Sequence, residues 1–187
     1  MQARRLEIPG ICEIVPEKHG DDRGYFAETF RDDWFRANIA DLGFVQENQS
    51  FSSAAGTVRG LHFQSEPFAQ GKLVRCVKGA VLDVAVDIRQ GSPYFGKWIG
   101  VELTSEELNQ LWIPPGFAHG FCTLSAGSVI AYKVTAYYSR ANDLGIACDD
   151  PDIGVKWPEI ADFGTLSAKD HDAPAMADIP EYFRFQG

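Results

Sequence analysis

Short runs in which apolar and polar residues alternate occupy most of the chain. Between residues 81 and 88, every second position carries a large aliphatic side chain: Leu82, Val84, Val86 and Ile88. A Gln-Gly-Ser-Pro sequence then ends the run, as expected for a half-buried strand followed by a turn. Similar runs, separated by Gly, Pro or Ser, cover residues 44–51, 57–64, 72–78, 98–103, 111–113, 120–124 and 129–138. The pattern therefore predicts many short strands.

A single stretch has helical spacing. Its apolar face begins after Asp32 or Asp33 and ends at Gly43; the face comprises Trp34, Phe35, Asn38, Ile39 and Leu42. Residues 150–187 contain four prolines and few strand-like runs, so we expect irregular segments there that wrap around the strands. We find no linker or internal repeat, and we predict one all-β domain over residues 1–187, a sandwich or small barrel with one short helix.

Composition narrows the possible functions. In 187 residues, 26 acidic side chains outnumber 17 basic ones, which gives a net charge of −9 and argues against a general attraction to nucleic acid or to acidic lipid. An anionic ligand must then be held by a few local cations. The chain has no apolar run of membrane-spanning length and no apolar signal-peptide stretch at its start, so we expect a cytoplasmic protein. Four scattered cysteines without a Cys-x-x-Cys pair are interpreted as reduced packing residues: Cys12, Cys76, Cys122 and Cys148.

Strand parity groups several polar side chains. Four neutral ones at every second position share one face, which is either the lining of a polar cavity or an exposed outer face, the more common arrangement: Gln46, Asn48, Ser50 and Ser52. Tyr132 and Tyr138 also share a face, about 20 Å apart along an extended strand. One ligand could touch both tyrosines only if it were long. Otherwise they are amphipathic side chains at a rim.

Two histidines fall within strand-like runs, His62 in Arg-Gly-Leu-His-Phe-Gln and His119 after Pro-Pro-Gly-Phe-Ala. Each is either a hydrogen-bonded structural residue or a functional one. The Pro-x-Gly-x-x-His spacing at His119 matches a metal-binding motif of cupin barrels, but no His-x-His strand accompanies it, and His19 and His171 lie near the two ends. Since a stable metal site needs about three protein ligands, the metal interpretation is the less favoured one.

Cations are few in this acidic chain, and several of them stand out. Arg59 precedes Gly60, which permits a close backbone approach, and two arginines such as Arg23 and Arg59 suit a diphosphate, because a guanidinium binds phosphate with two hydrogen bonds. Near the end of the chain, Lys169 adds a cation and Asp170 a carboxylate that could orient a histidine. For any one of these side chains, a solvated surface charge is the alternative.

Ordered motifs along nearly the whole chain resemble those of the thymidine diphosphate (dTDP)-4-dehydrorhamnose 3,5-epimerases. The motifs occupy residues 22–28, 46–52, 59–64, 72–75, 83–89, 92–96, 113–121, 132–138, 150–154 and 166–170. The resemblance implies a cupin-type jelly-roll barrel that works without metal or other cofactor. It also implies a homodimer. Because short sheets leave unpaired edges and the first ~30 residues look strand-like, we predict that N-terminal segments cross to the partner.

The resemblance further implies epimerisation at C3 and C5 of dTDP-4-dehydro-6-deoxy-D-glucose, which yields dTDP-4-dehydro-L-rhamnose for rhamnose and cell-wall polysaccharide synthesis. It makes His62 the base, Asp170 the partner that fixes the imidazole tautomer, Tyr132 the acid and Lys72 the stabiliser of the enolate oxygen. Asp143 stands where the family commonly has Glu. The implied substrate-binding residues are Arg23 and Arg59 at the diphosphate, Tyr138 on thymine, and Glu28, Gln46, Glu47, Asn48, His119, Asp143 and Lys169.

Other functions stay open on the sequence alone. A relative that inverts only C3 or only C5 would use the same base and acid. A metal-dependent cupin enzyme would use His62, His119 and a carboxylate. A non-catalytic barrel that binds nucleotide sugars would share the arginines but would not need Tyr132 together with His62 and Asp170. The presence of all three makes this last alternative the least favoured.

Overall fold

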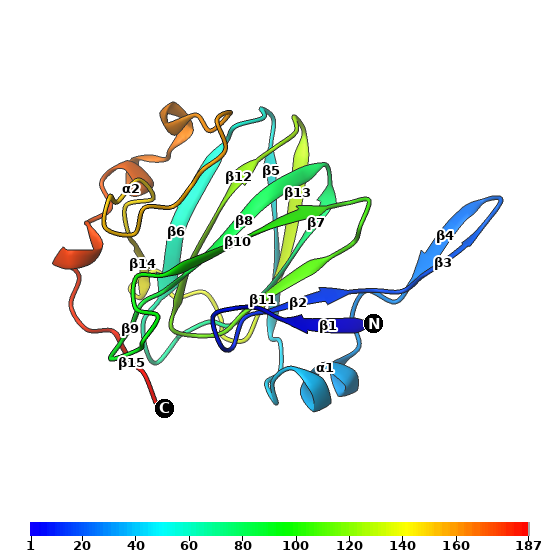
Figure 1. The fold of residues 1–187 in the computed structure, drawn as a ribbon, viewed down its shortest axis with the longest axis horizontal. Coiled ribbons are helices and arrows are strands. Elements are labelled where there is room, and N and C mark those ends of the chain that lie inside the picture. The colour runs from blue at the N-terminus through cyan, green and yellow to red at the C-terminus, as the bar shows by residue number, and fades with distance from the viewer. Residues whose placement is uncertain (187) are drawn as a thin grey trace.

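The computed structural model describes residues 1–186 as two antiparallel β-sheets packed face to face (Figure 1). One sheet has six strands in the order β1 (Gln2–Arg5), β2 (Cys12–Val15), β11 (Gln110–Ile113), β7 (Lys72–Lys78), β13 (Ser128–Val134) and β5 (Gln46–Ser52). The other has five, in the order β10 (Trp98–Thr104), β8 (Ala80–Asp87), β12 (Phe117–Thr123), β6 (Val58–Gln64) and β14 (Asp143–Gly145). The sheets stay separate, as in an open jelly roll, which confirms the all-β prediction. The last residue of the predicted domain, Gly187, lies outside the described residues.

Smaller elements surround the two sheets. The hairpin of β3 (Lys18–Asp21) and β4 (Gly24–Ala27) projects away from the rest of the molecule in Figure 1. Helix α1 (Asp32–Asn38) covers part of the six-stranded sheet, and β9 (Arg89–Gln90) pairs in parallel with β15 (Phe183–Arg184). The remaining elements are η1 (Phe163–Thr165), α2 (Ala168–His171) and η2 (Met176–Asp178). None of the helices in residues 1–186 is long and apolar enough to cross a membrane.

Apolar side chains form the interior on both sides of the five-stranded sheet. Between the sheets, Val74 of β7 and Leu111 of β11 pack with Val81 and Ala85 of β8. The outer face of the five-stranded sheet is covered by the C-terminal segments, whose Trp157, Ile179 and Tyr182 pack against residues such as Val58 and Val86. This covering, visible in orange and red in Figure 1, confirms the expectation that the end of the chain wraps around the strands.

Two boundaries differ from the sequence prediction. Helix α1 ends at Asn38, so Leu42 lies beyond it and is exposed. Strand β13 ends at Val134, and Tyr138 does not share a strand with Tyr132, so that part of the prediction is wrong. The physical reason is that Thr135 turns the chain away: its backbone N–H and its side-chain hydroxyl both bond to the backbone of Gly71, at 3.1 and 2.8 Å.

Strand β5 settles the two interpretations of the polar face. Gln46, Asn48 and Ser50 are half-buried and Ser52 is buried, while the alternate positions at 47, 49 and 51 are exposed. The four polar side chains therefore face the space between the sheets. The commoner arrangement, an exposed outer face, is wrong here because the outer face of this edge strand carries the opposite parity, including Phe51.

Candidate active site

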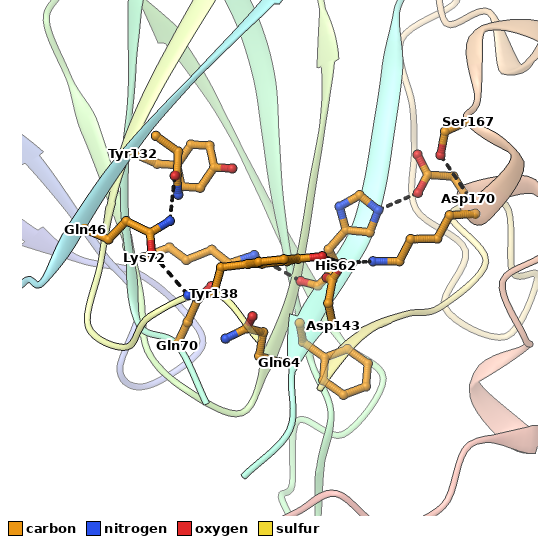
Figure 2. A pocket seen from close by; sticks show the side chains of 13 residues that line it. Gln46, His62, Gln64, Gln70, Lys72, Tyr132, Tyr138, Asp143, Ser167 and Asp170 are labelled. Carbon is orange, nitrogen blue, oxygen red and sulfur yellow. Dashed lines mark hydrogen bonds and ion pairs between the residues drawn. The ribbon is translucent and has the colours of Figure 1, made fainter. Parts of the chain in front are cut away.

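A pocket of about 450 Å³ opens at one end of the space between the two sheets, within the size range of small-molecule sites. Side chains from both sheets line it, together with the chain that follows β13 and the segment around α2 (Figure 2). Nine residues predicted as catalytic or substrate-binding come together here: Gln46, Asn48, His62, Lys72, Tyr132, Tyr138, Asp143, Lys169 and Asp170.

His62 enters the pocket from β6 through a tight local packing of two strands. Gly60 has φ +115°, and a Cβ there would lie 2.5 Å from the Cα of Gly120, so only glycine lets β6 approach β12 this closely. The close approach places His62 opposite His119 in the strand register. The sequence motif that contains His62 thus provides both the side chain and the backbone that positions it.

Asp170 is held beside His62 by α2, a single turn in the C-terminal segment. The side chain of Ser167 caps this turn by accepting from the Asp170 backbone N–H. His62 Nε2 is hydrogen-bonded to Asp170 Oδ1 (Figure 2). Burial acts to raise the pKa of Asp170, but the hydrogen bond from His62 and the contact with Ser167 outweigh it and lower that pKa, so Asp170 is a carboxylate at neutral pH. The imidazole therefore presents its Nδ1 atom to the pocket as the free nitrogen.

Tyr132 lies across the pocket from His62, on the other sheet (Figure 2). Its strand, β13, pairs with β5 so that Tyr132 is directly opposite Asn48. Burial, followed by the charge of Asp143, raises the pKa of Tyr132 above that of a free tyrosine, against smaller opposing effects of Arg59 and Asn48. The hydroxyl is thus protonated at neutral pH and can serve as a proton donor.

Lys72 extends from β7 into the same pocket, and its Nζ donates a hydrogen bond to the backbone oxygen of His62, at 3.2 Å. Burial lowers the pKa of this ammonium to about 8, although the charges of Asp143 and Asp83 act in the opposite direction. A buried ammonium close to its pKa is well suited to meet negative charge that develops on a ligand.

The mouth of the pocket is bordered by a chain of polar contacts. Gln46 accepts a hydrogen bond from the Tyr138 backbone N–H at 3.1 Å, and the Tyr138 hydroxyl lies 3.4 Å from Asp143 Oδ2. Asp143 in turn forms an ion pair with Lys169 at 2.6 Å. Tyr138, although it is not on β13, therefore still faces the pocket that Tyr132 lines (Figure 2).

Several lining residues were missed by sequence reasoning. The Gln64 side chain donates to the backbone oxygen of Tyr137 and accepts from the Ser139 N–H, and Gln70 donates to the backbone oxygen of Ala136. These amides hold the segment that carries Tyr138. Gln64 is the last residue of the motif that contains His62, and this position could have indicated that it lines the pocket. Gln70 follows a turn, and nothing in the sequence marks it as a lining residue.

Five predicted site residues lie outside the pocket lining of this chain. Arg23, at the tip of the projecting hairpin, has a side chain that is 89% exposed and is paired with Asp21; Glu28 is exposed just after that hairpin. Glu47 points to the outer face, where it forms an ion pair with Lys133 at 3.0 Å. The other two are Arg59, which bonds to Ser52 and to the Phe51 backbone, and His119, which is buried and bonded to Asp83.

The two histidines of the metal-dependent alternative contact different carboxylates. His62 Nε2 bonds to Asp170, whereas His119 Nε2 bonds to Asp83 at 2.8 Å. Over residues 1–186, no group of three or more His, Cys, Asp or Glu side chains is arranged to hold a metal ion.

Comparison with known proteins extends the resemblance from motifs to the whole chain. The family model described as dTDP-4-dehydrorhamnose 3,5-epimerase matches residues 5–178. The chain belongs to that family. A relative from Sinorhizobium fredii with the same description is 55% identical over 185 residues, which cover 99% of this chain and 94% of the relative. A second, from Shigella flexneri, is 47% identical over 184 residues, 98% of this chain and 99% of the relative.

A solved structure of this epimerase family shows the same fold. The crystal structure of dTDP-6-deoxy-D-glucose-3,5-epimerase from Legionella pneumophila, in complex with dTDP-4-keto-L-rhamnose, aligns with a TM-score of 0.93 at 42% identity. The alignment covers 100% of this chain and 99% of that one. The sandwich described above is therefore the fold of the epimerase family.

Proposed function

We propose that the protein converts dTDP-4-dehydro-6-deoxy-D-glucose to dTDP-4-dehydro-L-rhamnose by inverting C3 and C5 of the sugar ring. Both carbons adjoin the C4 ketone, which acidifies their hydrogens because the resulting carbanion is delocalised as an enolate. One base and one acid on opposite faces of the ring then suffice to invert a centre.

His62 acts as the base in this proposal. Its Nδ1 takes the proton from C3 or C5, one centre at a time, while the electrons of the C–H bond move onto the C4 oxygen. The Lys72 ammonium faces that oxygen and stabilises the negative charge. Tyr132 then donates its proton to the carbon from the opposite face as the C4 ketone re-forms. Before the second centre reacts, the His62 imidazolium releases its proton to solvent and the Tyr132 phenolate takes one up from solvent. Asp170 keeps the imidazole in the tautomer whose Nδ1 is free and stabilises the imidazolium that forms.

The observation that carries this proposal is the placement of His62 and Tyr132 on opposite sheets across one pocket, with the His62 imidazole bonded to Asp170. The identity to curated epimerases over nearly the whole chain supports the substrate class. The Legionella relative, whose structure contains dTDP-4-keto-L-rhamnose, supports the product.

The test is incubation with the 4-keto nucleotide sugar in deuterated water, followed by mass spectrometry and NMR. The protein should release an inverted sugar that carries deuterium at C3 and C5. His62→Ala should lower both exchange and inversion by about 10² to 10⁴-fold because the base is gone. Tyr132→Phe keeps the ring but removes the hydroxyl, so exchange should persist with retained configuration while inverted product falls sharply.

Each outcome against these expectations has a definite meaning. Exchange by His62→Ala at the parental rate would remove His62 from the mechanism. Equal inversion by Tyr132→Phe and the parent would assign the acid to another group or to water. Deuterium at only one of the two carbons would replace the proposed reaction by the single-centre alternative.

We also propose that the working unit is a homodimer with exchanged N-terminal hairpins. An isolated two-stranded hairpin is marginally stable in water, yet β3–β4 projects from the molecule with Tyr25 and Phe26 exposed at 56% and 71%. Phe51 and Val77 are also exposed on the outer face of the six-stranded sheet. Pairing of two copies would cover these side chains and bring Arg23 of one copy toward the pocket of the other.

Light scattering should give twice the chain mass of 20.7 kDa. Phe26→Asp should shift the protein toward the monomer, whereas Phe163→Asp, at an exposed phenylalanine of the C-terminal segment, should not. Mixing Arg23→Ala and His62→Ala proteins should restore up to about a quarter of the activity, because about half of the dimers are then mixed and each mixed dimer contains one intact site out of two. A monomeric parent, or a mixture that stays inactive after subunit exchange, would refute the hairpin exchange.

We further propose a cytoplasmic location. The four cysteines are all buried and unpaired, as expected of a protein that works in a reducing compartment. The arginines assigned to the diphosphate serve a small nucleotide sugar, and nucleic acid is not among the proposed partners.

A further inference from the structure

Next to the pocket, one buried carboxylate is only half satisfied. Asp83 is fully buried on β8, with its side chain between the inward-facing Val81 and Ala85. Its Oδ1 is bonded to His119 Nε2 at 2.8 Å. Its Oδ2 is the one buried side-chain nitrogen or oxygen in the described part of the chain that has no hydrogen-bond partner. A buried polar atom without a partner is costly, so Asp83 calls for an explanation.

His119 supplies a hydrogen bond to Asp83 but not a charge. Burial lowers the pKa of His119, an effect larger than the opposing influence of Asp83, so the imidazole is neutral at pH 7. The contrast with Asp87, four residues along the same strand, is direct: this equally buried carboxylate is paired with Arg89 at 2.6 Å and with Ser92 at 2.7 Å. The charge on Asp83 must therefore be balanced by a cation that is not in direct contact.

Lys72 is the cation that faces Asp83 from the opposite sheet. It lies on the inward parity of β7 together with Val74 and is buried. The charged groups around the Lys72 ammonium are Asp143, Asp83 and Lys169, and both His62 and His119 lie nearby. Asp143 already has its own cation, because it forms an ion pair with Lys169 at 2.6 Å. Asp83 is thus the neighbouring carboxylate that no other cation neutralises.

We propose that Asp83 is the buried counter-ion of Lys72, held in position by His119, and that it keeps the Lys72 ammonium charged until the enolate forms. The proposal rests on the proposed function, in which Lys72 meets the enolate oxygen. Asp83 acts through Lys72 and touches no substrate, so it is a positioning residue. Without it, burial would be opposed by Asp143 alone, whose charge Lys169 offsets, and Lys72 would shift toward the neutral amine, which cannot stabilise an oxyanion.

The test is the pH profile of deuterium incorporation into the 4-keto sugar, from pH 6 to pH 10. In the parent, activity should fall as pH rises through the Lys72 pKa of about 8. Asp83→Asn keeps the shape and an acceptor for His119 but removes the charge. The fall in activity at high pH, the alkaline limb of the profile, should therefore move to a pH about one unit lower in this variant, since an opposite charge nearby shifts a pKa by about 1 to 3 units. Exchange at pH 8 should then drop roughly fivefold, because the protonated fraction of Lys72 falls from about one half to about one eleventh, while dTDP affinity should change by less than about twofold.

Three further variants separate this electrostatic role from a structural one. Lys72→Arg keeps a permanent charge, so the alkaline limb that Lys72 causes should disappear, and adding Asp83→Asn should leave any remaining limb in place. Asp87→Asn, on the same strand, should lower stability and leave the limb in place. Asp83→Ser removes the charge and leaves room for water beside His119, and it serves as a second test should the Asn variant not fold.

The outcomes also separate this proposal from the proposed function. A parent that exchanges no hydrogen would refute the proposed function itself. A parent that exchanges, with an alkaline limb that stays in place in Asp83→Asn and in Asp83→Ser, would overturn the counter-ion role alone. A shift of equal size in the Lys72→Arg background would also overturn it, because the shift would then not arise from Lys72.

Discussion

The two ends of the space between the sheets are built from the same strands but have opposite character. On β7, Val74 packs in the apolar interior and Lys72, two residues earlier, lines the pocket. On β13, Ile130 packs in the interior and Tyr132 lines the pocket. Since inward-facing residues recur at every second position, a residue of the apolar interior and a residue of the pocket lining are only about 7 Å apart along each strand.

This difference explains how a polar pocket keeps its geometry. Each functional side chain on these strands is anchored by an apolar neighbour two positions away, in an interior that is packed as densely as a crystal. The apolar end supplies stability, and the polar end is left free to hold groups in unfavourable surroundings, such as a buried ammonium. We expect substitutions at the two ends to separate stability from activity.

The largest expected effect is on stability, at the apolar end. Leu111→Ala removes a fully buried side chain that packs with Val74, and the free energy of unfolding should fall by about 2 to 5 kcal/mol. Urea denaturation measures this change. Deuterium exchange per folded molecule should stay near the parental rate; a loss of exchange without a loss of stability would mean that the two ends are not separable.

Arg59→Ala should weaken dTDP binding by about 1.5 to 3 kcal/mol, because a charge-assisted contact with the diphosphate is lost. Arg59 is already oriented by hydrogen bonds to Ser52 and to the Phe51 backbone. Its side chain therefore loses little conformational entropy when the ligand binds. Calorimetric titration with dTDP gives the value, and Arg59→Lys should recover only part of it. Parental affinity in the Ala variant would place the diphosphate elsewhere.

Asp170→Asn should lower the exchange rate by about ten- to a hundredfold, since the base remains but loses its orienting carboxylate. Stability gives a second readout with a definite sign. The pKa of Asp170 is lowered from 3.8, so its contribution to folding is present above that pH and disappears as pH falls through the lower, folded-state pKa. The stability difference between parent and variant should therefore shrink in acid. A difference that is constant down to pH 2 would contradict the assignment.

The smallest effect is expected at the rim. Asp143→Glu restores the longer carboxylate that is common in the family, but Asp143 already reaches Lys169 at 2.6 Å. The Michaelis constant should change by less than about threefold, or about 0.65 kcal/mol. A larger change in steady-state kinetics would show that the length of this side chain determines substrate fit.

The sequence carries local information about this site better than long-range information. Alternation on β5 correctly groups Asn48 with the other polar side chains of one face, and Gly60 correctly indicates a close backbone approach, because both are properties of neighbouring residues. Alternation alone does not tell which face of β5 lies inside. Asp170 lies 108 residues from His62, and only the family resemblance paired them. The end of β13 was mispredicted because the Thr135 contacts that terminate it come from a distant turn.

Asp83 left a signal that we did not use. It is a charged residue on an inward parity whose neighbours, Val81 and Ala85, are apolar. A charged residue at such a position either interrupts the apolar face without a role or has a function that offsets the cost of burying it, and the spacing alone does not distinguish the two. Arg23 is a different case. In the proposed homodimer it would reach the pocket of the other copy, and a single chain does not contain that contact.

The C-terminal segment over residues 146–182 gives His62, the proposed base, its hydrogen-bond partner without belonging to the sheet that carries His62. Asp170 is delivered by α2, and the segment is held by contacts such as the Ala147 N–H to the Pro174 oxygen at 2.9 Å. Local unfolding of the α2 turn would separate Asp170 from His62 while the strands of both sheets stay paired, and we expect it to lower the exchange rate. The surroundings of His62 therefore depend on a segment that packs through Trp157, Ile179 and Tyr182 on the outer face of the five-stranded sheet, opposite the face that holds the pocket.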